Sequence, residues 1–353
     1  MALALTFLAV GNADCVIAIP ESRVAVVIDI GDVFRAEQHL QAAGVSVISV
    51  VYITHEHDDH APSLEKLDAF LVRWLGRSCS IRRIRLPRGL GHLWKVRIEE
   101  LNSRGDAKDT KKALRLRGAL QRLATLHQKK APAVLDGGQG EDPHRDGDLT
   151  VEVLHPSYLF LEALEGPPPK PNEASLVLRL SYGRFAAMLL GDLDGRGTEE
   201  CAFVATHSLD SVKAHLVKIP HHGAWPRSAK AAQALTALLA SIHPELAILS
   251  VGSTNKYGHV TPELFSALLE LKQQIDLRFI CTEVTQTCLL PETERDGRGL
   301  PFQQCAGDIT VTAEATGQWT HTTAETDHTA KVRSIPHAAC DGRAVLPLVR
   351  RRR

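Results

Sequence analysis

The stretch that decides how this chain folds is Thr54-His55-Glu56-His57-Asp58-Asp59-His60. Its H-x-H-x-D-H pattern places three imidazoles and one carboxylate within six residues. These four potential metal ligands are His55, His57, Asp59 and His60. The run before them, residues 47–53, is apolar and β-branched, which predicts a buried strand. Because imidazole and carboxylate groups suit zinc and similar divalent ions, the pattern predicts a metal-binding loop at a strand end.

Further potential ligands follow three later apolar runs, each of which is typical of a short buried strand. Asp192 follows residues 186–190, His221 and His222 follow residues 216–219, and His259 comes after residues 247–251. A single polar residue after a strand carries little information. Four such strand ends in one chain predict a shared edge where ligands meet.

With these pieces in place, the chain resembles the metallo-β-lactamase superfamily, and within it the hydrolase domain of ComEC-type DNA-uptake proteins. The resemblance spans about residues 1–290. The matching segments are Gly11–Cys15, Ile28–Gly31, Thr54–His60, Asn172–Leu178, Leu189–Asp192, Pro220–Gly223 and Asn255–His259. The H-x-H-x-D-H motif is the most specific of them. The resemblance implies a four-layer αβ/βα sandwich and a hydrolase that uses two divalent ions, Zn or Mn, with a hydroxide bridging them.

The resemblance also implies a role for each matching residue. His55 and His57 would bind the first ion, Asp59 and His60 the second, and Asp192 would bridge them. His221 would complete the second site. The catalytic set would be Asp59, Asp192, His259 and His222, with His259 expected to take part directly and His222 to support other ligands. The third ligand of the first ion is open between His155 and Asn172, and Asp14 and Asp29 are expected to support loops.

Length and composition are those of an ordinary globular protein of 353 residues, with 44% hydrophobic residues and a formal net charge of zero. We predict a hydrolase domain at residues 1–295, with helices at 33–43, 62–75, 106–130, 228–241 and 262–274. A C-terminal extension at 296–353 contains one predicted strand, 308–312. Neither a transmembrane span nor a signal peptide is apparent, and seven cysteines without such a signal favour a cytoplasmic protein with reduced thiols.

Residues 73–130 differ from the rest of the chain in charge, and we interpret them as a basic helical insertion. They contain 17 Lys or Arg and only 4 Asp or Glu. Such a surplus either forms a solvated helix face or binds phosphates. The residues we assign to nucleic-acid binding are Arg82, Arg83, Arg85, Lys108, Lys111, Lys112 and Arg115.

The last part of the chain carries a second group of potential ligands. Cys281, Cys288, Cys305 and Cys340 follow one another, and His337 lies three residues before the last of them. This pattern predicts an additional structural zinc that would hold the C-terminal extension in place. Two disulfides and simple buried thiols are the alternatives.

The resemblance and the basic insertion together imply a phosphodiesterase or nuclease that acts on DNA. The first alternative is a hydrolase of small esters, lactones or thioesters on the same metal core, which requires an apolar pocket. The second is a non-catalytic partner protein, and the complete set of ligand-type residues argues against it.

Overall fold

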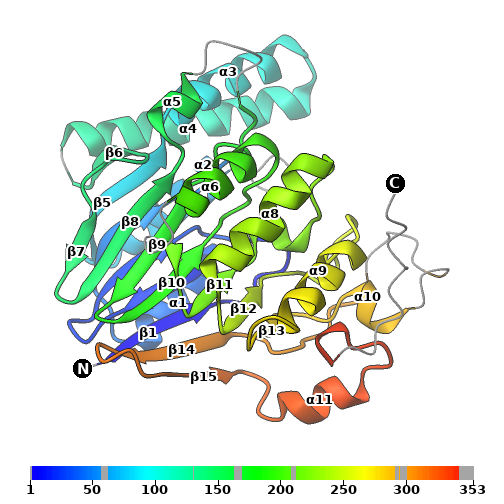
Figure 1. The fold of residues 1–353 in the computed structure, drawn as a ribbon. Coiled ribbons are helices and arrows are strands. Elements are labelled where there is room, and N and C mark those ends of the chain that lie inside the picture. Colours follow the sequence, from blue (N-terminus) through cyan, green and yellow to red (C-terminus); the bar gives the residue numbers. More distant parts are fainter. Residues whose placement is uncertain are drawn as a thin grey trace.

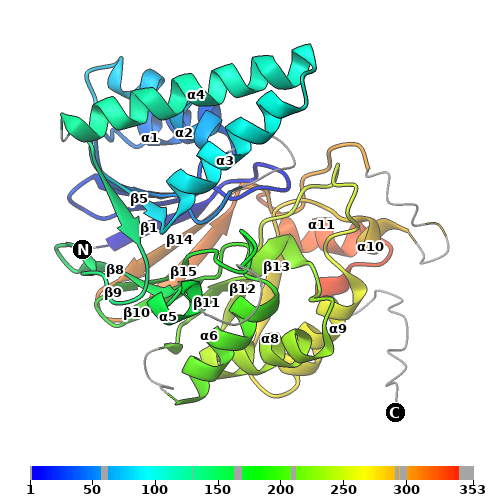
Figure 2. The ribbon, with the colours of Figure 1, turned by 90° about the horizontal axis from the view of Figure 1, so that it is seen from above.

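The chain folds into two mixed β-sheets that face each other, with helices on both outer surfaces (Figures 1 and 2). The computed structural model describes residues 2–56, 63–129, 131–162, 169–207, 212–290, 294 and 300–341. This arrangement is the four-layer αβ/βα metallo-β-lactamase sandwich that the resemblance implied. Among the described residues, no helix is both long and apolar enough to span a bilayer.

The first sheet has eight strands in the order β15-β14-β1-β2-β3-β4-β5-β6. They are β1 Ala2–Phe7, β2 Val16–Ile19, β3 Val24–Ile28, β4 Val47–Tyr52, β5 Ser80–Pro87, β6 Ala133–Gly137, β14 Ile309–Glu314 and β15 Trp319–Thr323. Strands β3 to β6 are parallel, and the other pairs are antiparallel.

The second sheet has seven strands in the order β13-β12-β11-β10-β9-β8-β7. They are β7 His144–Asp146, β8 Leu149–His155, β9 Val177–Tyr182, β10 Phe185–Leu189, β11 Leu216–Lys218, β12 Leu246–Leu249 and β13 Arg278–Cys281. Strands β10 to β13 are parallel, as are β3 to β6 of the first sheet. Each sheet therefore has a parallel part whose strand ends can carry a site.

Helices α1 to α4 cover the first sheet, and α6, α8 and α9 cover the second (Figure 2). The longer helices are α1 Val33–Ala42, α2 Ser63–Leu75, α3 Leu90–Ser103, α4 Ala107–Gln128, α6 Gly195–His207, α8 Ala229–Ile242 and α9 Pro262–Lys272. Shorter ones are α5 Tyr158–Leu161, η1 Pro220–Gly223, α10 Gln286–Leu289, α11 His328–Ser334 and η3 Ala339–Asp341.

Side-chain caps fix the starts of several helices where the sequence predicts them. The Asp32 carboxylate accepts hydrogen bonds from the backbone of Phe34 at 2.9 Å and of Arg35 at 3.0 Å, so α1 begins at Val33. Asp106 caps α4 in the same way. The predicted helix 106–130 is thus observed as α4, although Lys130 lies outside the described residues.

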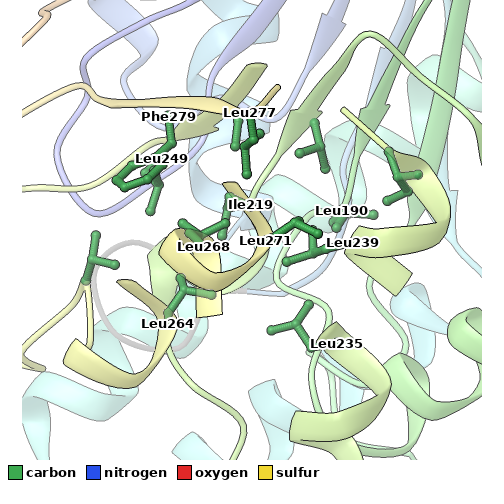
Figure 3. Close-up of a cluster of buried hydrophobic side chains, with 14 of the residues drawn as sticks. Leu190, Ile219, Leu235, Leu239, Leu249, Leu264, Leu268, Leu271, Leu277 and Phe279 are labelled. Carbon is green, nitrogen blue, oxygen red and sulfur yellow. The ribbon is translucent and has the colours of Figure 1, made fainter. Parts of the chain in front are cut away.

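Apolar side chains fill three layers: one between the sheets and one under each set of helices. The layer under α8 and α9 is shown in Figure 3, where Leu235 and Leu239 of α8 and Leu264 and Leu268 of α9 point towards the strands. Burial of such side chains is the dominant stabilising contribution. It also holds the strand ends, and hence the residues after them, in fixed positions.

The segment that we expected to be a separate extension contributes two strands to the first sheet. Strand β14 pairs with β1 over six residue pairs, from Ala2↔Glu314 to Phe7↔Ile309, and β15 pairs with β14. Ile309, Val311 and Ala313 are buried between the sheets. Strand pairing and burial between the sheets therefore hold this segment, and the predicted strand 308–312 is observed as β14.

Candidate metal centre

The potential ligands of the two sheets meet at the carboxyl ends of the parallel strands. His55 follows β4, Asp192 follows β10, and His221 and His222 follow β11. His55 comes from the first sheet and Asp192 from the second, yet their side chains are in contact. The predicted convergence of strand ends on a shared edge is thus observed for the described residues.

His55 is held in one tautomer by its neighbours. The Thr54 hydroxyl donates a hydrogen bond to Asp29 Oδ2 at 2.6 Å, and its oxygen lies 2.8 Å from His55 Nδ1. Because the hydroxyl proton is used for Asp29, the Thr54 oxygen accepts the Nδ1 proton of His55. The lone pair of Nε2 then faces Asp192 Oδ2, 3.1 Å away. An imidazole oriented in this way by a second group is typical of a metal ligand.

His55 Nε2 and Asp192 Oδ2 face each other and together suit a bound cation. Burial lowers the pKa of His55, but the Asp192 carboxylate outweighs burial and the pKa is raised above its ordinary value. Burial also raises the pKa of Asp29 to about 6, against the opposing effects of His55 and Thr54. A divalent ion bound by Nε2 and Oδ2 would supply the positive charge that this pair attracts, so the donor set fits a metal.

Asp192 is placed by a tight turn after β10. Its backbone N–H donates to Ser175 Oγ at 3.0 Å. The preceding residue, Gly191, has a φ of +51°, and a Cβ there would lie 2.3 Å from the same oxygen. The turn at Gly191-Asp192 therefore packs closely on Ser175 of the Asn172–Leu178 segment, and this contact fixes the backbone that carries the carboxylate.

The two consecutive histidines differ in orientation, and His222 lies close to the Asp192 carboxylate. His222 Nε2 lies 3.4 Å from Asp192 Oδ1, and its Nδ1 lies 2.9 Å from the carbonyl oxygen of Ser250, which leaves Nε2 directed at the carboxylate. His221 is less buried, and its Nδ1 lies 3.8 Å from Asp194 Oδ2. Both residues adopt left-handed backbone conformations, with φ of 49° and 53°. This geometry favours His222 as the ligand and places His221 at the wall of a cleft.

A buried ion pair adjoins Asp192. The Lys218 ammonium, on β11, donates to the Asp14 carboxylate and to the carbonyl oxygen of Gly191 at 2.9 Å, and it lies 4.0 Å from Asp192 Oδ1. Among the described residues, one group of three acids or histidines has all its ligand atoms within 4.8 Å of one another. That group is Asp14, Asp192 and His222.

The alternatives for the third ligand of the first ion differ in their surroundings. His155 is buried, with Nδ1 2.6 Å from Glu200 Oε2 and Nε2 2.8 Å from the carbonyl oxygen of Glu173. Burial opposes its charged form, but Cys201, Glu200 and the Glu173 carbonyl outweigh burial and raise the pKa of His155 to about 10. With both ring nitrogens engaged, His155 has no lone pair for a metal.

Asn172, the other alternative, lies beside the strand-end residues. Its amide nitrogen is 3.3 Å from His221 Nε2. The remaining motif residues, His57, Asp59 and His60, lie outside the described residues. Their part in binding metal stays a prediction.

Glu56, next to His55, connects the H-x-H-x-D-H motif to the basic insertion at residues 73–130. Its carboxylate accepts hydrogen bonds from Ser63 at the start of α2 and from the indole of Trp94 on α3. Trp94 is almost fully buried. Glu56, directly after His55, is therefore anchored by a helix of the insertion.

The described strand-end residues lie at a cleft of about 930 Å³. Asp192, His221, His222 and His259 are among the residues that line it. The His259 ring lies 5.5 Å from that of His221, and its backbone N–H donates to Asn255 Oδ1 at 3.1 Å. Cationic residues of the lining are Lys170, Arg196 and Arg227, and aromatic ones are Trp225 and Tyr257. The cleft therefore combines charged and aromatic side chains.

The residues that we assigned to nucleic-acid binding are not equally accessible. Arg82 and Arg83 on β5 and Lys108 and Lys111 on α4 are exposed, whereas Lys112 is half-buried. Arg115 is exposed and pairs with Glu65 at 3.1 Å. Arg85 is buried and donates to the carbonyl oxygen of Asp142 at 3.0 Å, which removes it from any surface for a polyanion.

The late cysteines do not form a group of closely spaced ligand atoms in the described part of the chain, and the zinc site stays a prediction. Cys281, Cys288 and Cys305 are buried in the apolar layer of the second sheet, and Cys340 packs against it. The imidazole in contact with Cys305 is His328, at 3.4 Å, while His337 uses its backbone N–H for the Cys288 carbonyl oxygen. All five predicted zinc ligands are among the described residues, and no three of these five have ligand atoms within 4.8 Å of one another. Burial, together with the neighbouring cysteines, also raises the pKa of Cys281 and of Cys305.

Two features of the centre escaped the sequence analysis, although the sequence carries a signal for one. Lys218 is a charged residue inside the apolar run Leu216-Val217-Lys218-Ile219, and a buried charge must be paired. Asp14, expected only to support a loop, is its partner. The role of the Thr54 hydroxyl has no such signal, since threonine is common at strand ends.

No family model matches the chain, and no curated protein matches it in sequence. Solved structures resemble it in fold. CmlA, a diiron β-hydroxylase from Streptomyces venezuelae, is 13% identical with a TM-score of 0.44, and the match covers 79% of this chain and 53% of CmlA. Igni18, a metallo hydrolase from Ignicoccus hospitalis, is 13% identical with a TM-score of 0.40, and the match covers 89% and 99%.

A third similar structure is Zn(2+)-bound PqqB from Methylobacterium extorquens, which is 11% identical with a TM-score of 0.42. The match covers 80% of this chain and 98% of PqqB. This chain thus spans about half the length of CmlA and nearly the whole length of the other two. Identities of this size carry no information on activity, which must come from the site itself.

Proposed function

We propose that this chain is a metal-dependent hydrolase of the metallo-β-lactamase superfamily, that its reaction is phosphodiester hydrolysis, and that its substrate class is DNA. The observation that supports a metal centre is the arrangement around Asp192. Two imidazoles direct Nε2 at opposite oxygens of one buried carboxylate, His55 at 3.1 Å and His222 at 3.4 Å. Each has its Nδ1 beside another oxygen, of Thr54 or of Ser250.

In this proposal His55, His222 and Asp192 hold divalent ions, Zn or Mn, together with His57, Asp59 and His60 of the motif. Such ions lower the pKa of water and stabilise negative charge on phosphoryl oxygens. The protein contributes fixed ligand orientation, because Thr54 and Ser250 set the tautomers of the two imidazoles. His259 lines the cleft and is our candidate for the general acid that protonates the leaving oxygen.

The cleft is lined by the acids Glu56, Glu173, Asp192, Asp194 and Glu199 as well as by three cations, so binding of an anionic substrate would depend on these cations and on bound metal. Lys170 and Arg227 line it, and neither side chain has an ion-pair partner among the described residues. Arg196 pairs with Glu173 at 3.1 Å. Unpaired cations at the cleft suit phosphate oxygens. The alternative substrates, small esters or lactones, require an apolar pocket, and the aromatic side chains Trp225 and Tyr257 supply part of one.

The choice of DNA rests on the resemblance and on the basic surface of α4. Lys108 and Lys111 are exposed on this helix, and neither has an ion-pair partner among the described residues. An exposed lysine row of this kind binds phosphates by releasing counterions. Because Arg115 is already paired with Glu65, we assign the contact to the lysines first.

The test uses protein freed of metal by a chelator and then supplied with Mn²⁺ or Zn²⁺. We expect the metal-loaded protein to cleave bis(p-nitrophenyl) phosphate and labelled DNA, single- or double-stranded, and the metal-free protein to cleave neither. p-Nitrophenyl acetate and a simple lactone test the alternative. Cleavage of these esters without any cleavage of phosphodiesters would overturn the proposal.

A further inference from the structure

The buried ammonium of Lys218 is the most unusual charge in the described part of the chain. Its side chain is almost fully buried, at 1% exposure of the residue, and it lies beside two carboxylates rather than one. Asp14 is the contact partner, and Asp192 Oδ1 is 4.0 Å away. A lysine is almost never fully buried unless it is paired.

The strand register explains why this lysine points into the molecule. Leu216, two residues earlier on β11, packs between the sheets, while Val217 packs under the outer helices. Side chains alternate along a strand, so Lys218 faces the first sheet as Leu216 does. Asp14 lies in the segment between β1 and β2 of that sheet. The ion pair therefore joins the two sheets directly behind the candidate centre.

Asp14 and Lys218 also change the net charge around the candidate metal site. Asp14, Asp192 and His222 have their ligand atoms within 4.8 Å of one another, which is the composition of a cation site. The Lys218 ammonium already supplies a positive charge beside both carboxylates of this group. We propose that Lys218 is a fixed internal cation that Asp14 holds away from Asp192, and that this ion pair sets the divalent-metal affinity of the centre. The inference rests on the metal centre of the proposed function.

The sign of each charge change follows from Coulomb's law in a buried site. Without the Asp14 charge, Asp192 is the only one of these two carboxylates left beside the Lys218 ammonium. The ammonium then competes with the metal for the Asp192 carboxylate. Without the Lys218 charge, Asp14 is uncompensated and attracts divalent ions more strongly. Without both, the net charge of the group is that of the wild type. A role in joining the sheets alone predicts a different result, because loss of either partner, or of both, would weaken metal binding.

The experiment is a double-mutant cycle read by Mn²⁺ binding in the absence of substrate. The variants are Asp14→Asn, Lys218→Met and the two combined, and each is compared with the wild type by calorimetric titration at neutral pH. We expect Asp14→Asn to bind Mn²⁺ at least about tenfold more weakly, Lys218→Met to bind it more tightly, and the double variant to lie within about threefold of the wild type.

A matched control removes an ion pair elsewhere. Asp308→Asn breaks the pair with Arg35, whose charged atoms are 2.7 Å apart, and it should leave Mn²⁺ affinity unchanged. A double variant as weak as Asp14→Asn would overturn the inference. If Lys218→Met does not fold because Asp14 is left buried without a partner, the comparison of Asp14→Asn with the double variant decides alone.

Failure of this inference is distinguishable from failure of the proposed function. If the cycle holds but no phosphodiester is cleaved, the centre binds metal as inferred and the proposed reaction is wrong. If phosphodiesters are cleaved but the double variant stays weak, the reaction stands and the role of Lys218 is structural. A wild-type protein that binds no Mn²⁺ would overturn both.

Discussion

Two groups of potential metal ligands in this chain have opposite surroundings. The strand-end group, His55, Asp192 and His222, consists of buried polar side chains whose neighbours are also polar. The cysteine cluster, Cys281, Cys288, Cys305 and Cys340, lies in an apolar layer. Thr54 and Ser250 orient the imidazoles of the first group, whereas burial among apolar side chains raises the pKa of Cys281 and Cys305 in the second.

This comparison teaches that the residue types alone do not define a metal site. By residue type, the cysteine cluster has the better ligands for zinc, because thiolates bind zinc strongly. What it lacks is the set of partners that favours the ligand form and brings three donor atoms within reach of one ion. The surroundings of a ligand, rather than its identity, distinguish the two groups.

The largest expected effect comes from Asp192→Asn, which removes the charge that both imidazoles face while keeping the side-chain shape. We expect loss of phosphodiester cleavage by roughly three orders of magnitude or more, with reduced bound metal and an intact fold. Steady-state rates at saturating Mn²⁺ and metal analysis of the dialysed protein measure it.

Asp194→Asn is the matched control, because Asp194 lines the same cleft but contacts only His221 of the two histidines. It should retain most of the activity. If Asp192→Asn cleaves substrate as fast as the wild type at saturating metal, Asp192 is not a required metal ligand. The contrast between the strand-end group and the cysteine cluster would then no longer hold.

The next effect tests whether orientation matters as much as the ligands do. Thr54→Val keeps the size and branching of the side chain but removes the hydroxyl between Asp29 and His55. We expect metal affinity to fall by about 10- to 100-fold, the usual result of losing a group that orients a ligand. Competition with a fluorescent metal indicator measures the affinity.

Thr54→Ser provides the control because it keeps the hydroxyl. Its affinity should lie close to that of the wild type, and equal losses in the Ser and Val variants would mean that packing, not the hydrogen bond, is responsible. The Val variant should also be less stable by about 1–3 kcal/mol, because Asp29 loses a buried hydrogen-bond donor.

The architecture and the strand-end group were accessible from sequence for a physical reason. Apolar runs such as residues 216–219 predict strands, and polar residues after them predict a site because the ends of parallel strands are open to ligands. The different orientations of His221 and His222 were not accessible. They depend on two successive left-handed residues, and nothing in a His-His pair says which ring turns inward.

Long-range pairing accounts for most of the other differences. Strand β14 joins β1 across some 300 residues of chain, so the tail looked like an extension without a core. The Asp14–Lys218 pair likewise joins residues far apart in sequence. Arg85 lies two residues after exposed Arg83 and therefore on the same face of β5, and only its contact with the Asp142 carbonyl oxygen shows that it is buried.

A smaller effect is expected outside both groups, on the basic helix α4. Lys108→Glu combined with Lys111→Glu should weaken DNA binding about tenfold and lower the slope of log affinity against log salt by about 2. Cleavage of bis(p-nitrophenyl) phosphate should not change, because neither lysine lines the cleft. Fluorescence anisotropy at several salt concentrations gives both quantities.

The corresponding control reverses two exposed charges on other helices, Lys272→Glu on α9 and Arg333→Glu on α11. If both double variants weaken DNA binding equally, net charge rather than the surface of α4 is responsible. If neither does, the lysines of α4 are only a solvated face.

The smallest expected effect is on the metal content of the cysteine cluster. Cys340→Ser should leave the bound zinc per chain unchanged, since no three of the predicted ligands have donor atoms within 4.8 Å of one another in the described part of the chain. Protease resistance of the tail should also persist, because β14 is held by pairing with β1 and by burial of Ile309 and Val311. Zinc analysis and limited proteolysis measure the two quantities. Loss of about one zinc per chain would show that thiols in an apolar layer can assemble around an ion after all. The strand-end group and the cysteine cluster would then differ only in whether the metal binds before or after the chain folds.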